Sequence, residues 1–240
     1  MLYSAQGIIL HNTKYADKRF ISKIYTKQFG LITANVTIGG AKGKIKQGVL
    51  QPLTQVEIIA SVKENKDVQQ VSDMKCLFVY TDLQSNFSKL CIAQFLNEIL
   101  YKCLKEQIPN EDLFDLICHT YQWLDQAESQ FVDTHLYFLM ELSKHLGFYP
   151  INNYQEHTPY FDVQEGKFSS SIKSFPLGFD GKQSQLFSQL LKHSITNQKQ
   201  INKSERTMLL ECLIQYYKIQ LMGMAELKSY EVLQELATAF

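Results

Sequence analysis

The sequence predicts an α+β protein with two domains, a small β-barrel followed by a helical domain. The first 80 residues contain five short strand-like runs separated by turn residues, whereas after Tyr80 the apolar residues recur at intervals of three and four. Charge divides the chain at the same place. Residues 1–80 hold eleven Lys and Arg against five Asp and Glu, and the remainder holds thirteen against nineteen. Because strands and helices do not alternate, we expect separate domains at 1–80 and 81–240.

Strands account for the first 80 residues. An initial apolar run leads into the polar stretch 11–18, where we expect a turn. Residues 19–29 then alternate, which places every second residue from Phe20 to Thr26 on one face of a strand, and Gly30 ends it. Further strand-like runs lie at 31–38, 53–62 and 68–80. This pattern is typical of a small barrel or sandwich.

Helices account for the rest of the chain, apart from one irregular insert at 148–181 that is rich in aromatic residues, Pro and Gly. Gly147 and Pro150 give a helix stop signal before this insert. Asn202, with Glu205 three residues later, gives a capping-box pattern at the start of a helix near the end of the chain. The helical periodicity covers 86–106, about 109–124, about 129–146, 202–217 and the residues after Ser229.

Composition excludes several classes of protein. With 45% hydrophobic and 20% charged residues, the chain is of the folded globular kind. No apolar run approaches a membrane span, and the N-terminus lacks the basic and apolar segments of a signal peptide, so we expect no membrane association. The five cysteines are odd in number and never spaced C-x-x-C, which predicts free thiols in a reducing cytoplasm.

A basic glycine stretch, GGAKGKIKQGV at 39–49, lies between two of the predicted strands. A nucleotide-binding P-loop needs G-x-x-x-x-G-K-[ST], but Ile38 stands at the first glycine position and Ile45 at the hydroxyl position. Closely approaching glycine backbones with neighbouring lysines instead favour the phosphates of a nucleic acid. The candidate DNA-binding residues are Lys14, Lys18, Arg19, Lys23, Lys27, Lys42, Lys44 and Lys46.

The aromatic residues of the barrel allow two interpretations. Single-strand-binding barrels stack unpaired bases on aromatic side chains. The alternative is that these side chains belong to the barrel core. The residues concerned are Tyr3, Tyr15, Tyr25 and Phe29.

Catalytic and metal-binding patterns are weak, and we predict neither an enzyme nor a cofactor. Three histidines, His119, His135 and His145, fall on predicted helices, where a histidine is more often structural than a ligand. His157 and Asp162 lie in the insert without enough companions for a metal site. No cysteine has both a local histidine and the electropositive setting that would indicate a nucleophile.

Five segments, taken in order, carry a resemblance to a known family. The first half contains QGIILHNTKYADKRFISKIYTKQFGLITANVTIGGAKGK followed by LQPLTQVEI. The second half contains LMELSKHLGFYP, YFDVQEGKF and NKSERTMLLECLIQYYKIQLMGMAELKSYEVL. Together they resemble the RecO family of bacterial recombination mediators over nearly the whole chain. The resemblance implies an N-terminal OB-fold β-barrel and an all-helical C-terminal domain with a zinc-ribbon-like insert.

The resemblance also implies activities and partners. RecO proteins bind single- and double-stranded DNA and anneal complementary strands. They act with RecR, and often RecF, to displace single-strand-binding protein so that RecA can load. Members hold the acidic C-terminal tail of single-strand-binding protein on the helical domain, and Lys203 and Arg206, at a helix start, are the candidates here.

The insert departs from the family pattern. Many members carry two C-x-x-C pairs around the YFD segment, but the corresponding stretches here, INNYQEHTPYFD and FSSSIKSF, contain no cysteine. We therefore expect a zinc-free insert held by aromatic side chains. These are Tyr154, Tyr160, Phe161 and Phe168.

Two interpretations of function remain open at this point. The leading one is a cytoplasmic DNA-repair mediator that performs no covalent chemistry and screens the repulsion between two phosphate backbones. The alternative is a helical protein-interaction adaptor whose barrel binds RNA or protein. Binding of single-stranded DNA distinguishes them.

Overall fold

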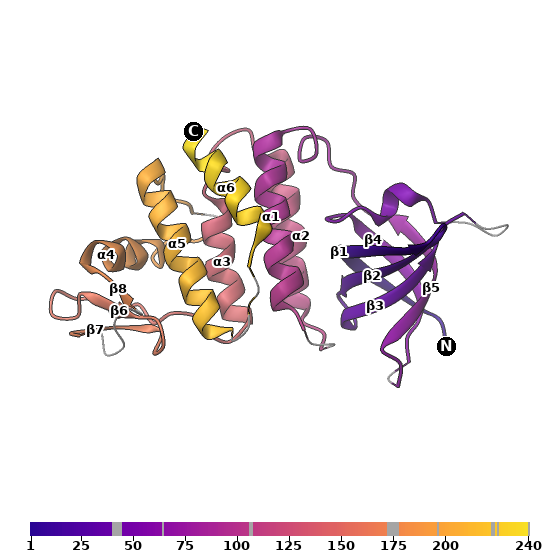
Figure 1. Cartoon of the computed structure of the whole chain (residues 1–240), viewed down its shortest axis with the longest axis horizontal. Helices are drawn as coiled ribbons and strands as arrows, with labels where there is room; N and C mark the ends of the chain where they lie inside the picture. Colours follow the sequence, from indigo (N-terminus) through magenta and orange to yellow (C-terminus); the bar gives the residue numbers. More distant parts are fainter. Residues whose placement is uncertain are drawn as a thin grey trace. The chain divides into compact units, whose positions relative to one another are not determined.

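The computed structural model describes residues 1–39, 45–63, 65–105, 108–171, 178–195, 197–221, 224 and 226–239. Its internal contacts divide the chain into two compact units, residues 1–126 and 127–240. The first unit contains a β-barrel and two helices, and the second contains helices and a small sheet (Figure 1). The predicted α+β class, with the strands of the barrel first, is therefore confirmed.

The barrel of the first unit is closed and has five strands, in the order β1-β2-β3-β5-β4. Neighbouring strands are antiparallel except β3 and β5, whose parallel pairing closes the barrel in an OB-like arrangement. The elements are β1 (Tyr3–Ala16), β2 (Arg19–Thr26), β3 (Gly30–Thr37), β4 (Gln55–Ser61), β5 (Val68–Cys76) and a short 3-10 helix η1 (Gln47–Leu50).

The alternation predicted for β2 is confirmed by its burial. Phe20, Ser22, Ile24 and Thr26 are all buried, because they point into the barrel. Phe20 and Ile24 join a hydrophobic core to which every strand contributes, together with Ile45 and Leu50. Burial of this apolar set is the main force that closes the barrel.

The turn predicted at 11–18 is wrong. Strand β1 continues to Ala16, and the turn is confined to residues 17–18. Asn12 explains the difference, because its side chain receives a hydrogen bond from the Ser22 hydroxyl and donates one to the Leu50 carbonyl oxygen. A polar residue that sequence reading assigns to a turn is therefore held within the strand, where register shifts bend β1 at two places.

Two helices, α1 (Phe87–Cys103) and α2 (Glu111–Gln126), belong to the same unit as the barrel. Asn97 on α1 donates from Nδ2 to the Leu10 carbonyl oxygen at 2.8 Å. At the β2–β3 turn, Gly30 has a φ of +64°, and a Cβ placed there would lie 2.5 Å from the Ile108 carbonyl oxygen. Only glycine adopts a positive φ readily and also leaves room for the Ile108 backbone. Gly30 therefore lets the segment before α2 lie against the barrel.

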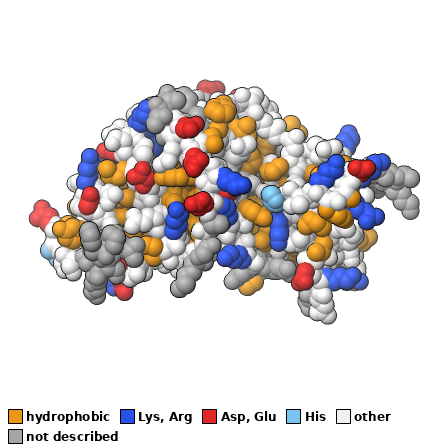
Figure 2. Space-filling view, viewed as in Figure 1, with side chains coloured by type: hydrophobic (Ala, Val, Ile, Leu, Met, Phe, Trp, Pro, Cys, Tyr) orange, Lys and Arg blue, Asp and Glu red, His pale blue; other side chains and the backbone are white. Residues whose placement is uncertain are grey.

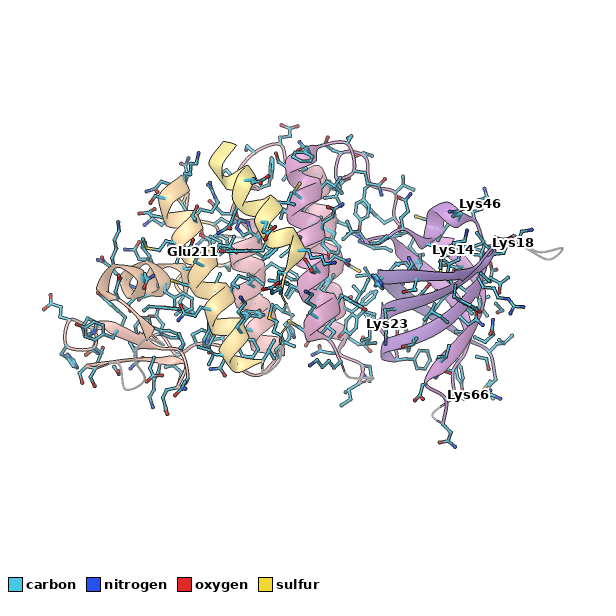
Figure 3. The ribbon with its side chains drawn as sticks, in the orientation of Figure 1. Lys14, Lys18, Lys23, Lys46, Lys66 and Glu211 are labelled. Carbon is cyan, nitrogen blue, oxygen red and sulfur yellow. The ribbon has the colours of Figure 1, made fainter. Side chains whose placement is uncertain are left out.

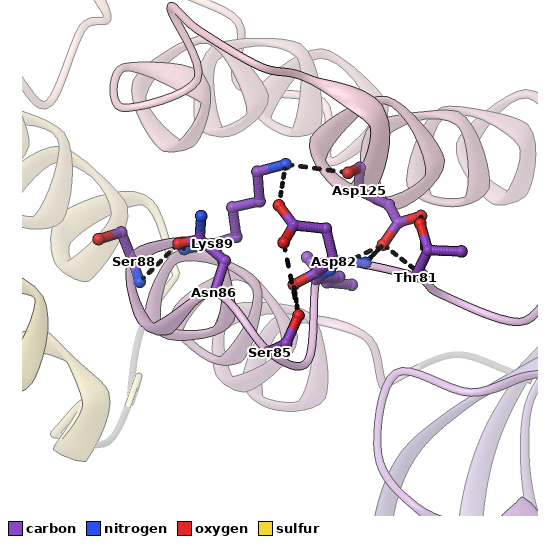
Figure 4. A network of polar contacts seen from close by, with 8 residues as sticks. Thr81, Asp82, Ser85, Asn86, Ser88, Lys89 and Asp125 are labelled. Carbon is purple, nitrogen blue, oxygen red and sulfur yellow. Dashed lines mark hydrogen bonds and ion pairs between the residues drawn. The ribbon is translucent and has the colours of Figure 1, made fainter.

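A buried carboxylate connects the segment that leaves the barrel to the end of α2 (Figure 4). Asp125 accepts hydrogen bonds from the backbone N–H groups of Thr81, Asp82 and Leu83, at 2.7–3.1 Å. The Lys89 ammonium lies 2.7 Å from Asp82 Oδ2 and donates to the Asp125 carbonyl oxygen at 2.9 Å. Residues 81–83 are thereby fixed to both helices.

The second unit surrounds an aromatic cluster. Phe161 lies at its centre and contacts the rings of Phe168, Phe179, Phe187 and Tyr216, with centroids 4.7–5.5 Å apart. Tyr154 packs edge-on against Phe168, whereas the ring of Tyr160 is half-buried. The elements are α3 (Thr134–His145), β6 (Tyr160–Asp162), β7 (Lys167–Ser169), β8 (Gly178–Phe179), α4 (Gly181–Leu190), α5 (Lys203–Gln220) and α6 (Lys228–Ala239).

The predicted start of α5 is confirmed and that of α3 is wrong. The Asn202 side chain and Glu205 form the expected capping box. Helix α3 begins at Thr134 instead of about residue 129. Asp133 precedes it, but its carboxylate makes no capping hydrogen bond because it is bound by Arg206. None of the helices in the described ranges is both long and apolar enough to cross a membrane.

Candidate nucleic-acid interface

Four predicted DNA-binding residues come together at one end of the barrel. Lys14, Lys18 and Arg19 lie on the β1–β2 hairpin, and Lys46 immediately precedes η1. All four side chains are exposed, and none forms an ion pair with another described residue. Lys14, Lys18 and Lys46 are labelled at this end in Figure 3, and Figure 2 shows basic side chains over the barrel.

Two contacts hold this basic end together. The Ile38 N–H donates to the Lys18 carbonyl oxygen at 2.8 Å, which fixes the end of β3 against the hairpin turn. The Asn12 amide bonded to Leu50 fixes η1 against β1. The cluster contains one acid, the exposed Asp17 in the turn itself. The local charge of the described residues is therefore clearly positive.

Residues 40–44 of the glycine stretch, with Lys42 and Lys44, lie outside the described residues. On either side of them, Ile38 is half-buried against the barrel core and Ile45 is 5% exposed within it. Ile38 and Ile45 therefore both lie at the end of the barrel that carries Lys18 and Lys46.

Lys23 and Lys27 lie away from this end. The half-buried Lys23 donates from Nζ to the Thr33 hydroxyl at 2.7 Å on the outer face of β2 and β3. The Lys27 ammonium lies 2.9 Å from Asp115 and 3.7 Å from Glu111, both on α2. The hydrogen bond to Asp115 raises the pKa of Lys27. This lysine joins the barrel to α2, and its charge is already compensated.

The four aromatic candidates divide between core and surface. Tyr25 is 2% exposed, its ring lies beside Phe114, and burial raises its pKa to about 12, so it belongs to the core. Tyr3 and Phe29 pack edge-on against each other, with centroids 5.7 Å apart. Tyr15 is 49% exposed beside Lys14 and donates its hydroxyl hydrogen to Asn35 at 3.0 Å. Of the four, only Tyr15 is an exposed ring within the basic cluster.

Sequence reasoning did not single out two further lysines of the barrel. Lys63 and Lys66 are exposed on the connection between β4 and β5, where Figure 3 labels Lys66. The polar segment that contains them was predicted only as a turn. Glu64 and Asp67 stand in the same segment, so the two lysines are balanced by two acids and the connection carries no net charge.

The predicted partner-binding residues of the second unit differ in their surroundings. Lys203 is exposed at the first position of α5. Arg206 is 8% exposed, its Nε lies 2.5 Å from Asp133 Oδ1, and it also donates to the Ile201 carbonyl oxygen at 3.0 Å. Burial raises the pKa of Asp133 more than Arg206 lowers it. Arg206 therefore fixes the start of α5 against α3.

No group of three or more His, Cys, Asp and Glu that could hold a metal ion occurs within the part of the chain that the structure describes. The thiols are free, and burial raises the pKa of Cys103, Cys118 and Cys212 to about 12. Burial also lowers the pKa of His135 to about 3. These groups are thus held in their neutral forms at neutral pH.

Comparison with known proteins assigns the family. Residues 1–80 match the family model described as Recombination protein O N terminal, and residues 84–231 match Recombination protein O C terminal. The chain belongs to the RecO family of DNA repair proteins. RecO relatives are similar along nearly their full length.

Three proteins named DNA repair protein RecO illustrate the similarity. The protein from Bacteroides fragilis is 31% identical over 240 residues, and that from Flavobacterium psychrophilum is 32% identical over 241 residues. The protein from Porphyromonas gingivalis is 26% identical over 246 residues. Each comparison covers 98% of this chain and 99% of the relative.

Proposed function

We propose that this RecO chain is a DNA-binding recombination mediator that acts in the cytoplasm without covalent chemistry. It binds single- and double-stranded DNA through the basic end of its barrel and anneals complementary strands. With RecR, and with RecF where present, it helps to load a recombinase onto single strands covered by single-strand-binding protein. The observation that carries the proposal is the cluster of exposed cations Lys14, Lys18, Arg19 and Lys46, which lack acidic partners among the described residues.

The physical basis of annealing is charge neutralisation. Each lysine that approaches a phosphate releases a condensed counterion, so affinity falls with salt and does not depend on base sequence. A protein surface that binds two strands lowers the repulsion between them and raises their local concentration. Exposed, unpaired lysines on a rigid barrel end suit this role because no protein ion pair has to be broken first.

A salt titration tests the barrel. Fluorescence anisotropy of labelled single-stranded DNA is measured between about 50 and 200 mM salt. Two variants remove three cations each, Lys14/Lys18/Arg19→Ala and Lys42/Lys44/Lys46→Ala. If each cation meets one phosphate, the slope of log affinity against log salt becomes shallower by about 2, from about 0.7 per contact.

Lys27→Ala is the matched control, because that ammonium is bound by Asp115 and we expect its loss to leave the slope unchanged. Unchanged slopes in both triple variants contradict the assignment of the basic end. Absence of DNA binding by the wild type favours the adaptor interpretation, in which the barrel binds RNA or protein.

The partner surface is tested separately. We propose that the second unit binds the acidic C-terminal tail of single-strand-binding protein near the start of α5, with Lys203 as a contact. The proposal is supported by the exposure of Lys203 at a helix N-terminus, where backbone N–H groups favour anions. Lys203→Ala should weaken binding of a tail peptide in calorimetry, and Lys192→Ala is a control on an exposed lysine of the same unit. Equal affinity in both variants contradicts the assignment.

A further inference from the structure

A hollow of about 580 Å³ lies beside the basic cluster, between the β1–β2 hairpin and η1. This volume is within the range of small-molecule sites, about 300–1,000 Å³. Its lining comes from two segments that are distant in sequence and that the Asn12–Leu50 contact brings together. The lining residues are His11, Asn12, Phe20, Gln47, Gly48, Leu50, Gln51 and Pro52.

The floor and the rim of the hollow differ in chemistry. Phe20 and Leu50 are 9% and 4% exposed and give an apolar floor. Gln47 and Gln51 are exposed at the rim, and within the described part of the chain neither side-chain amide forms a hydrogen bond. An apolar floor with amide donors and acceptors at its rim suits a planar heteroaromatic ring, whose faces are apolar and whose edges hydrogen-bond.

The charges around the hollow indicate what carries that ring. Lys14 pairs with Phe20 in the β1–β2 register, so both side chains lie on the same face of the sheet. Lys46 precedes Gln47 at the opposite rim. The lining contains no Asp or Glu. The two lysines favour a ligand whose planar ring has an anionic group on each side. A nucleotide within a strand is such a ligand, because its base lies between two phosphates.

We propose that this hollow receives one unpaired base of a bound single strand, while Lys14 and Lys46 hold the phosphates on either side. The inference rests on the proposed DNA binding and adds a base-binding site to it. A base in a duplex has to leave its stack to enter, which costs a few kcal/mol. The hollow therefore gives the barrel a preference for single strands that the phosphate contacts alone do not give.

The test compares a thymidine oligonucleotide with an abasic one of the same length, which keeps the phosphates and lacks the bases. Gly48 lines the hollow, its φ is not positive, and a Cβ placed there meets nothing within 4 Å, so Gly48→Phe can fill the space without a backbone clash. Gly181→Phe in α4, where a Cβ also meets open space, is the matched control. Circular dichroism shows whether both variants are folded.

We expect the wild type and Gly181→Phe to bind the thymidine strand on the order of tenfold more tightly than the abasic strand, as for one stacked base. Gly48→Phe should bind both strands alike. Gln47/Gln51→Ala, which alters only exposed side chains, should lose part of the preference as a second variant. Equal binding of both strands by the wild type, with a steep salt dependence, overturns the base site and leaves DNA binding intact. Failure to bind either strand overturns the proposed function itself.

Discussion

Asp125→Ala is the most direct test of how the barrel is joined to its two helices. The Asp125 carboxylate is 4% exposed and accepts hydrogen bonds from three consecutive backbone N–H groups at 81–83. Alanine removes the acceptor and leaves the N–H of Leu83, itself a buried residue, without its partner. The substitution alters no residue of the basic end, so its effect on stability can be measured apart from the proposed DNA binding.

The expected cost follows from the number of hydrogen bonds lost. A hydrogen bond to a charged group contributes about 1.5–3 kcal/mol. Thr81 is exposed, so water replaces the carboxylate at its N–H, whereas the bonds from Asp82 and Leu83 are counted in full. Two such bonds give about 3–6 kcal/mol, a large part of the 5–15 kcal/mol that is typical of a whole protein.

The assay is urea unfolding at neutral pH, with the free energy of unfolding taken from the first unit's transition. Asp112→Ala is the control, because this exposed carboxylate in the first turn of α2 contributes at most about 1 kcal/mol. Asp125→Asn should fall between wild type and alanine, since its amide keeps one acceptor but turns a second donor toward the N–H groups.

The pH dependence gives an independent check. Burial raises the pKa of Asp125, but the hydrogen bonds from Leu83, Asp82 and Thr81 together outweigh it and the net pKa is lowered. A lowered pKa in the folded state means that the charged form contributes stability above about pH 4, and that this is lost as the pH falls through the folded value. The gap between wild type and Asp125→Ala should therefore narrow in acid. A neutral-pH difference below about 1 kcal/mol, or a constant gap, refutes the reasoning.

Three further predictions concern the unit boundary, Arg206 and the thiols. A fragment of residues 1–126 should show a cooperative unfolding transition by circular dichroism. A fragment of residues 1–80 should not, because that fragment lacks Asp125 and both helices. Equally cooperative unfolding of the two fragments contradicts this prediction. Arg206→Ala should cost about 3–5 kcal/mol in thermal unfolding by leaving its aspartate partner buried and unpaired, and a loss below about 1 kcal/mol identifies a surface arginine instead. In a thiol-reagent assay at pH 8, exposed Cys76 should react first, half-buried Cys118 more slowly, and the buried thiols only on unfolding; fast reaction of the buried thiols in the folded protein contradicts this. The buried thiols are Cys91, Cys103 and Cys212.

Local signals in the sequence predicted local structure well. The alternation from Phe20 to Thr26 and the Asn202–Glu205 capping box were readable because both depend on residues a few positions apart. The turn expected at 11–18 failed because Asn12 is held by Ser22 and Leu50, contacts that no local pattern reveals.

Site residues were harder to predict because charge alone does not show what a side chain faces. Lys27 and Lys18 look alike in sequence, yet Lys27 meets Asp115, 88 residues away. Arg206 offered a readable signal, since it shares the helical spacing of Leu209, Leu210 and Leu213 and so belongs to the buried face of α5.

The anchoring of the glycine stretch between Ile38 and Ile45 has an evolutionary consequence. Both isoleucines pack on the barrel core, so the core does not depend on how many residues join them. Lengthening a connection between two fixed points is inexpensive, about 0.6 kcal/mol for each doubling. Selection can therefore add or remove lysines between these isoleucines, and so adjust the strength of the proposed DNA binding, while the fold stays the same.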